Sequence, residues 1–183
     1  MRILAISGSL RALSFNTAAL QASAVLAPAG LEIVLYVGMG DLPHFNPDLD
    51  TDEPPESVKA FRREVGTSDG LLLAAPEYAH GIAGAFKNAL DWLVSCVEFP
   101  DKPVALINAS ERATHAQGHL REILATMSAR LIDRASITLP LMGRNLDAAG
   151  ILADPELSGQ LQAALAMFLA EINALKDGSE RGT

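Results

Sequence analysis

The sequence predicts an α/β protein in which a parallel sheet of five strands is covered by helices on both faces. Short apolar segments at 2–7, 31–37, 70–76, 103–109 and 135–141 alternate with segments of helical periodicity. The segment at 70–76 is nearly all apolar, which is typical of a strand that is buried on both faces. Strands that alternate with helices form parallel sheets, because each helix carries the chain back to the start of the next strand.

Five segments have the features of helices. We expect helices over 16–27, after Pro55, from the turn at 77–81 to about Val97, over 120–131, and from Asp154 to about residue 175. The helix after Pro55 has Val58, Phe61 and Val65 on one face. The helix over 120–131 has Leu120, Ile123, Leu124, Met127 and Leu131 at helical spacing. The last begins with Asp-Pro-Glu, an N-cap followed by proline in the first turn. This pattern predicts one domain over 1–175 and a flexible C-terminal tail over 176–183.

The composition excludes several classes of protein. The chain has 183 residues and a net charge of −8, from 14 basic and 22 acidic residues. Such an acidic chain lacks the electrostatic footprint of a nucleic-acid-binding protein, although it could bind one phosphate locally. It has no apolar run of about 18 residues, so we expect no membrane-spanning helix. Cys96 is the single cysteine, which excludes an internal disulfide, a Cys-rich zinc site and an iron–sulfur cluster. Because the N-terminus also lacks a signal peptide, we expect a cytoplasmic location.

The loop at 8–17 has the residues of an anion site. Ligands of parallel sheets bind beyond the carboxyl ends of the strands, and here a strand leads into a helix N-terminus with free N–H groups. Ser9, Ser14 and Asn16 add short polar side chains. Arg11 adds a guanidinium that suits phosphate. The loop has neither the Gly-Lys-Ser/Thr of a P-loop nor a GxGxxG pattern. The alternative is a plain helix cap with Arg11 on the surface.

The loop after the third predicted strand has features that suit a flat ligand. Gly81 and Gly84 permit a close approach of the backbone, and Tyr78 could stack on the ligand or cap it. The alternative is a tight turn followed by an amphipathic helix with Trp92 in the core. The loop at 108–115 follows the fourth strand and belongs to the same edge of the sheet.

One group of aspartates and one pair of histidines have spacings similar to those of metal ligands. Asp48, Asp50 and Asp52 are spaced like the first ligands of a calcium loop, but Glu53 and Lys59 stand where glycine and glutamate are needed. His115 and His119 are one helical turn apart, but a third ligand and the glutamate of H-E-x-x-H are missing, so we predict no metal.

Two further residues each have two possible roles. His80 could contact a bound substrate or be a surface histidine. Glu77 could pair with a cation across a subunit interface or cap the helix that follows its loop.

The two loops together resemble signatures of the NAD(P)H-dependent FMN reductase family, flavodoxin-like proteins that include quinone, azo-dye and chromate reductases. The first signature, G-S-x-R-x-x-S-x-N, is matched throughout from Gly8 to Asn16. The second, P-E-Y-N-x-S-x-P-G-x-L-K-N-x-x-D-W, is matched at Pro76, Glu77, Tyr78, Gly84, Lys87, Asn88, Asp91 and Trp92, and the chain departs from it at Ala79, Gly81, Ala83 and Phe86. The order of strands and helices agrees over about residues 1–175.

This resemblance implies a flavodoxin-like three-layer sandwich with strand order 2-1-3-4-5 and an FMN cofactor. It places the FMN phosphate at Ser9, Arg11, Ser14 and Asn16, and Phe15 is also expected to bind the cofactor. It places the isoalloxazine along Pro76, Glu77, Tyr78, Ala79 and His80, with Asn108, Ala109 and Ser110 closing the other side. The departures at Ala79 and Gly81 remove side chains near the ring, where backbone N–H groups could still serve.

The resemblance also implies an oxidoreductase that passes two electrons from NADPH or NADH to a quinone, a similar small acceptor or FMN itself. No side chain is assigned a catalytic role, because the flavin carries the chemistry. A homodimer or homotetramer is implied, with no nucleic-acid or membrane partner. The long loop at 38–56 is expected to frame a second planar molecule over the flavin. The alternative function is that of a non-enzymatic flavodoxin-like electron carrier, although the T-G-N-T loop of flavodoxins is absent.

Overall fold

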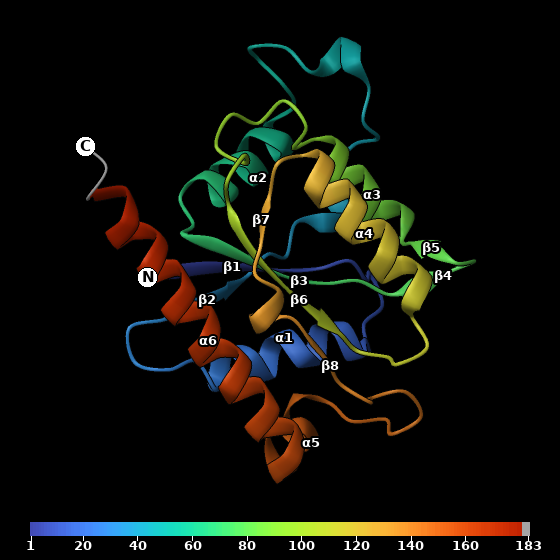
Figure 1. Ribbon diagram of the computed structural model, residues 1–183. Helices are drawn as coiled ribbons and strands as arrows, with labels where there is room; N and C mark the ends of the chain where they lie inside the picture. Colours follow the sequence, from blue (N-terminus) through green and yellow to red (C-terminus); the bar gives the residue numbers. More distant parts are fainter. Residues whose placement is uncertain (181–183) are drawn as a thin grey trace.

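The computed structural model describes residues 1–180 and has a parallel sheet at its centre (Figure 1). Its strands are β1 (Arg2–Ser7), β2 (Glu32–Leu35), β3 (Gly70–Ala74), β6 (Pro103–Asn108), β7 (Arg130–Leu131) and β8 (Ile137–Thr138). The order is β2-β1-β3-β6-β7, and β8 also pairs with β6. All of these pairs are parallel. The predicted α/β fold and the order 2-1-3-4-5 are therefore confirmed, with the fifth strand in two pieces.

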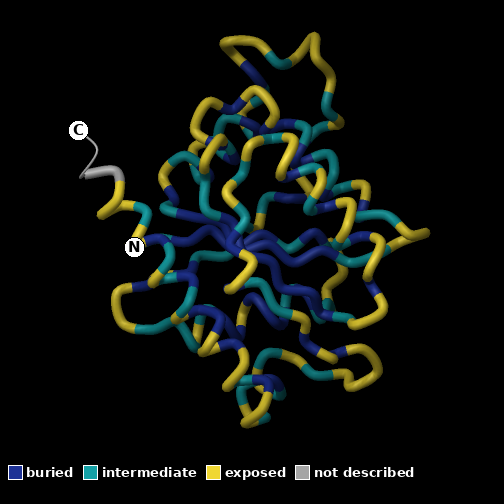
Figure 2. Tube along the Cα trace, viewed as in Figure 1, coloured by how far each residue is buried: buried dark blue, intermediate teal, exposed yellow. Residues whose placement is uncertain are grey.

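Helices cover both faces of this sheet (Figure 1). One face carries α1 (Phe15–Val25), α5 (Ala148–Ala153) and α6 (Pro155–Glu180), and the other carries α2 (Glu56–Gly66), α3 (Gly84–Asp91) and α4 (Thr114–Thr126). Each face has its own buried apolar cluster, which includes Leu161 and Phe168 on the first face and Phe61 and Trp92 on the second. The strands form the buried centre in Figure 2, and β3 is buried along its whole length as predicted.

The fifth strand differs from the single strand predicted at 135–141. A 3-10 helix at Asp133–Ala135 separates β7 from β8. The Ser136 hydroxyl fills the resulting gap in the ladder, since it accepts a hydrogen bond from Leu106 N and donates one to Ile132 O, both at 3.1 Å. The prediction that Leu131 belongs to the preceding helix is wrong, because α4 ends at Thr126 and Leu131 lies in β7.

A short hairpin follows β3, where the sequence predicted a plain turn. Its antiparallel strands are β4 (Glu77–Tyr78) and β5 (Gly81–Ile82). The two residues between them, Ala79 and His80, have positive φ values of 48° and 60°. Two left-handed residues give a two-residue turn the twist that hairpin strands need. The helix predicted to reach Val97 ends earlier, because α3 stops at Asp91 and irregular turns follow.

The long segment between β2 and α2 contains two 3-10 turns, Met39–Asp41 and Pro47–Leu49. The segment is anchored by α3 and the residue after it. Asn88 donates from Nδ2 to Pro43 O at 2.9 Å, and Trp92 donates from Nε1 to the same oxygen at 2.8 Å. Trp92 is fully buried, so its predicted place in the core is confirmed.

The C-terminal helix is longer than predicted. α6 continues past residue 175 to Glu180, and α5, which was not predicted, precedes it. Lys176, within the expected tail, donates from Nζ to Asp69 Oδ1 at 2.6 Å. The last residues of the expected tail, 181–183, lie outside the described part of the chain. Among the described helices, none has the length and apolar character needed to cross a membrane.

Candidate flavin-binding site

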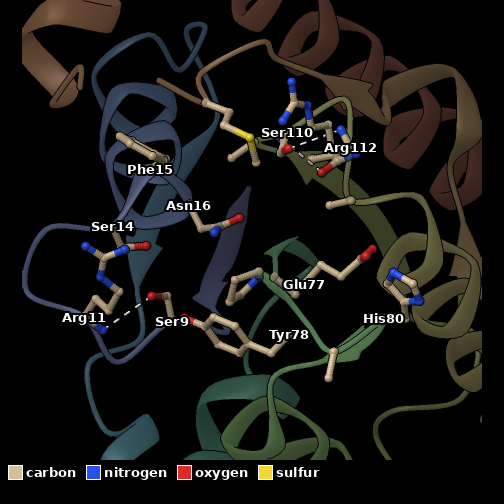
Figure 3. Close-up of a pocket in the computed structure, with 17 residues that line it drawn as sticks. Ser9, Arg11, Ser14, Phe15, Asn16, Glu77, Tyr78, His80, Ser110 and Arg112 are labelled. Carbon is tan, nitrogen blue, oxygen red and sulfur yellow. Dashed lines mark hydrogen bonds between the residues drawn. The ribbon is translucent and has the colours of Figure 1, made fainter. Parts of the chain in front are cut away.

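Three loops at the carboxyl ends of β1, β3 and β6 surround a cavity of about 490 Å³ (Figure 3). The residues predicted to hold the cofactor all line it: Ser9, Arg11, Ser14, Phe15, Asn16, Pro76, Glu77, Tyr78, Ala79, His80 and Ser110. Asn108 and Ala109, expected on the far side, line it as well. The parallel topology explains this convergence, since β1 lies beside β3 and β3 lies beside β6.

The first loop forms one end of the cavity around the start of α1. Ser14 is the N-cap of α1, and its Oγ accepts a hydrogen bond from Thr17 N at 3.3 Å. Ser9 Oγ accepts from Arg11 N at 3.3 Å, so the loop is folded on its own side chains. The helix-cap interpretation is thus correct for Ser14, and it leaves the helix dipole and the Arg11 guanidinium available to an anion.

The environment of the Asn16 side chain shows whether this end of the cavity suits a polar ligand. The residue is only 8% exposed, and it lines the cavity. Its Oδ1 atom is buried and has no hydrogen-bond partner among the described residues. A buried polar atom without a partner costs about 1–3 kcal/mol. Because the oxygen and nitrogen of an amide can exchange places, Asn16 can accept from a ligand hydroxyl or donate to a phosphate, and FMN offers both.

Gly8 is required at the start of this loop by packing. A Cβ built on it would lie 2.9 Å from the Phe86 ring and 3.2 Å from the Ala75 Cβ. Phe86 is one of the departures from the second family signature, and it is fully buried beneath the loop. The departure at Phe86 therefore changes the packing beneath the loop, and Phe86 is not among the residues that line the cavity.

The hairpin forms the other end of the cavity and is attached to α4. The Glu77 carboxylate accepts a hydrogen bond at Oε2 from Ala116 N, at 2.9 Å. The N-cap of α4 is Ala113, which has no side chain able to cap the helix. Glu77 therefore supplies the missing cap from a distant part of the chain, and it caps α4 instead of α3, the helix that follows its own loop.

A second contact joins the hairpin to the same helix. The imidazole rings of His80 and His115 are stacked, with centroids 4.2 Å apart and planes 18° apart. His80 lines the cavity, whereas His115 lies in the first turn of α4 outside it. Within residues 1–180, no three His, Cys, Asp or Glu side chains are grouped as metal ligands.

The cavity has residues that sequence reasoning did not assign to it. Arg112 and Ala113 follow β6, and Met142 follows β8. The position of Arg112 in the loop at 108–115 was a usable signal, but nothing local pointed to Met142. Neither Arg11 nor Arg112 forms an ion pair with any residue in the described range. An acidic chain thus places two guanidinium groups and one carboxylate, Glu77, around this cavity.

The long loop at 38–56 does not behave as expected. None of its residues lines the cavity, so within one chain it does not frame a second molecule there. Asn88 and Trp92 hold it on the side of α3, and Arg62 adds an ion pair to Asp50 at 2.9 Å. Two residues of the second family signature therefore have a structural task away from the cavity.

Comparisons with known proteins agree with this geometry. The chain matches the family model described as NADPH-dependent FMN reductase over residues 1–141. It is 35% identical to an NAD(P)H-dependent FMN reductase of Pseudomonas aeruginosa, covering 90% of this chain and 91% of that protein. It is 32% identical to a 2-hydroxy-1,4-benzoquinone reductase of Burkholderia, covering 93% and 95%.

Solved structures give the same result. The flavoenzyme NAD(P)H:(acceptor) oxidoreductase of Paracoccus denitrificans superposes with a TM-score of 0.83 and 30% identity, covering 94% of this chain and 97% of that one. A flavodoxin of Bacillus cereus, at 15% identity and a TM-score of 0.61, shares the fold. The two sequence signatures, the cavity at the sheet edge and these matches lead to one conclusion: the chain belongs to the NADPH-dependent FMN reductase family of flavin-dependent oxidoreductases.

Proposed function

We propose that this cavity binds FMN and that the protein passes two electrons from NAD(P)H to a small quinone-like acceptor. The observation that carries the proposal is the buried Asn16 Oδ1, which has no hydrogen-bond partner among the described residues and lies in the first turn of α1, at the end of the cavity that Arg11 also lines. A cavity of about 490 Å³ also lies within the range usual for cofactor sites. Names of relatives such as 2-hydroxy-1,4-benzoquinone reductase support a quinone as acceptor.

The proposed orientation follows from the two ends of the cavity. The phosphate would lie at the first loop, against Ser9, Arg11, Ser14, Phe15 and Asn16. The ring would lie between Pro76, Glu77, Tyr78, Ala79 and His80 on one side and Ser110 on the other. Bound FMN supplies hydride chemistry, and the protein supplies placement and electrostatics. The guanidinium groups of Arg11 and Arg112 would favour negative charge on bound groups.

Exposed apolar side chains near the cavity support a dimer or tetramer as part of the proposal. Leu10, Leu13, Tyr78 and Met142 are 61%, 84%, 54% and 52% exposed, and Tyr78 and Met142 line the cavity. Side chains of this kind are usual at contacts between subunits. Light scattering after gel filtration gives the mass that tests this part. A cytoplasmic location remains part of the proposal, supported by the free Cys96 thiol.

Anaerobic stopped-flow absorbance tests the enzymatic function. FMN-loaded protein is mixed with NADPH or NADH alone, and the flavin absorbance should bleach in a two-electron step. Excess quinone should then restore the oxidised spectrum, and steady-state rates should follow ping-pong kinetics. If neither nicotinamide reduces the flavin while an added flavoprotein reductase does, the protein is an electron carrier. Loss of FMN on gel filtration would instead indicate that FMN is a substrate.

A further inference from the structure

We propose that His80 donates the proton that a quinone-type acceptor requires and that His115 positions the His80 ring for this task. The proposal rests on the proposed function, because it places the acceptor in the cavity over bound FMN. Figure 3 shows His80 at the edge of the cavity, on the hairpin turn, away from the end that contains Arg11.

His80 lies on a hairpin that two contacts with α4 hold in place, one of which is made by the His80 ring. The His80 backbone has a φ of 60°, a conformation that non-glycine residues seldom adopt and that surrounding contacts must therefore stabilise. One stabilising contact is the stack on His115, at 4.2 Å between centroids. The other is the hydrogen bond from Ala116 N to Glu77, three residues earlier on the same hairpin. A strained residue in a cavity wall is typical of a functional position.

The chemistry of the acceptor creates the need for a proton donor. A quinone becomes a hydroquinone by gaining two electrons and two protons, of which a hydride equivalent supplies both electrons and one proton. In the step assigned here, an N–H bond of protonated His80 breaks and an O–H bond forms on the acceptor oxygen. The neutral imidazole then regains a proton from solvent, and NAD(P)H is the species oxidised overall.

His80 is the cavity residue whose chemistry suits this step. The other polar side chains of the lining are of types that do not suit it: a guanidinium group is not deprotonated in proteins, and free serine and tyrosine hydroxyls are very weak acids. Glu77 uses its carboxylate to cap α4. Imidazole is the side chain that ordinarily gains and loses a proton near pH 7, and His80 is itself exposed, so it can regain a proton directly from solvent.

The test compares two acceptors that differ in their need for a proton. Benzoquinone takes up protons on reduction, whereas ferricyanide accepts single electrons and takes up none. For each variant, binding of FMN is first checked by its visible spectrum, and the reduced flavin is then mixed with each acceptor in the stopped-flow instrument. Wild-type protein that binds no FMN refutes the proposed function itself, whereas variants that bind FMN allow the His80 proposal to be judged separately.

His80→Asn is the first variant, because asparagine tolerates a positive φ. General acid catalysis contributes about 10²–10⁴-fold, so the ratio of the quinone rate to the ferricyanide rate should fall about a hundredfold. The matched control is His119→Gln, which alters a histidine of α4 that does not line the cavity and should keep the wild-type ratio. An unchanged ratio in His80→Asn would overturn the proposal.

His80→Gly provides a second test of proton donation by His80, because glycine accepts this backbone conformation without strain. Added imidazole should raise its quinone rate and leave its ferricyanide rate unaffected, and absence of rescue counts against proton donation. His115→Ala should lower the acceptor ratio, whereas His115→Phe should restore it, because phenylalanine keeps an aromatic plane for stacking. Equal ratios in the two His115 variants would refute the positioning role.

Discussion

The side chain of Asn88 fastens the backbone of Phe45, since its Oδ1 accepts a hydrogen bond from Phe45 N at 2.7 Å. The same amide donates to Pro43 O, so one side chain of α3 satisfies two backbone groups of the long loop between β2 and α2. Asn88 belongs to the second family signature, whose first residues, Pro76, Glu77 and Tyr78, line the flavin-binding cavity. The signature therefore combines residues of the cavity wall with residues that hold this loop in place.

Replacing Asn88 should reduce stability without reducing flavin affinity. Asn88→Ala leaves Phe45 N without its partner, and a buried group left unsatisfied costs about 1–3 kcal/mol. Urea unfolding of the apo-protein measures this loss. Lys87→Ala is the matched control, because it removes a half-exposed ion pair with Asp91 on the same helix and should cost less than about 0.5 kcal/mol. A large loss of FMN affinity in Asn88→Ala would contradict the assigned role.

FMN should bind more tightly than riboflavin, because the first loop offers the α1 N-terminus, Arg11 and three short polar side chains to a phosphate. A hydrogen bond to a charged group contributes about 1.5–3 kcal/mol, so the difference in affinity should exceed about tenfold. Quenching of flavin fluorescence on titration with apo-protein measures both dissociation constants. Equal dissociation constants for FMN and riboflavin would show that the phosphate does not bind at this loop.

Arg11→Ala should weaken FMN binding by about 10- to 150-fold, the equivalent of one hydrogen bond to a charged group. The unfolding free energy of the apo-protein should hardly change, because Arg11 forms no ion pair within the described residues. Riboflavin affinity serves as the internal control and should remain as in the wild type. Wild-type FMN affinity in this variant would make Arg11 a surface residue.

Asn16→Ala, like Arg11→Ala, should lower the affinity for FMN without lowering the stability of the apo-protein. Its Oδ1 has no partner in the described chain, so its removal should not lower the stability of the apo-protein and should relieve the cost of the unpaired oxygen. FMN affinity should fall about tenfold, as expected for the loss of one hydrogen bond. Calorimetric titration and thermal unfolding of the two apo-proteins give both quantities. A marked loss of apo stability with unchanged affinity would assign Asn16 to the fold.

Stability should decline at high pH because of Tyr36. Burial, followed by the negative charges of Asp41 and Glu64, raises the pKa of Tyr36 to about 12, above its ordinary value of about 10. The folded state therefore holds this proton more tightly, so the contribution is complete below pH 10 and is lost as pH rises to about 12. Tyr36→Phe should flatten the decline measured by chemical unfolding of the apo-protein. Tyr78→Phe, at the exposed tyrosine, should leave it unchanged.

The sequence by itself determined the features that depend on neighbouring residues. Alternating apolar segments predicted the strands β1, β3 and β6, and the helix-capping pattern of the first loop predicted the start of α1. Parallel topology then placed the loops after these strands at one edge, so the residues of the cavity could be named in advance. Local periodicity and short motifs are enough for such predictions, because hydrogen bonds in helices and the burial of a strand follow from residues close in sequence.

Tertiary structure decided what depends on contacts between distant residues. A 3-10 helix splits the fifth strand, and the Ser136 hydroxyl accepts the β6 hydrogen bond left in the gap. Glu77 caps a helix that begins after residue 113. Met142 reaches the cavity from a loop with no sequence signal, and the long loop is held against α3 rather than over the cavity. Each of these outcomes depends on which distant atom satisfies a buried hydrogen-bonding group, and a linear pattern of residue types does not specify that atom.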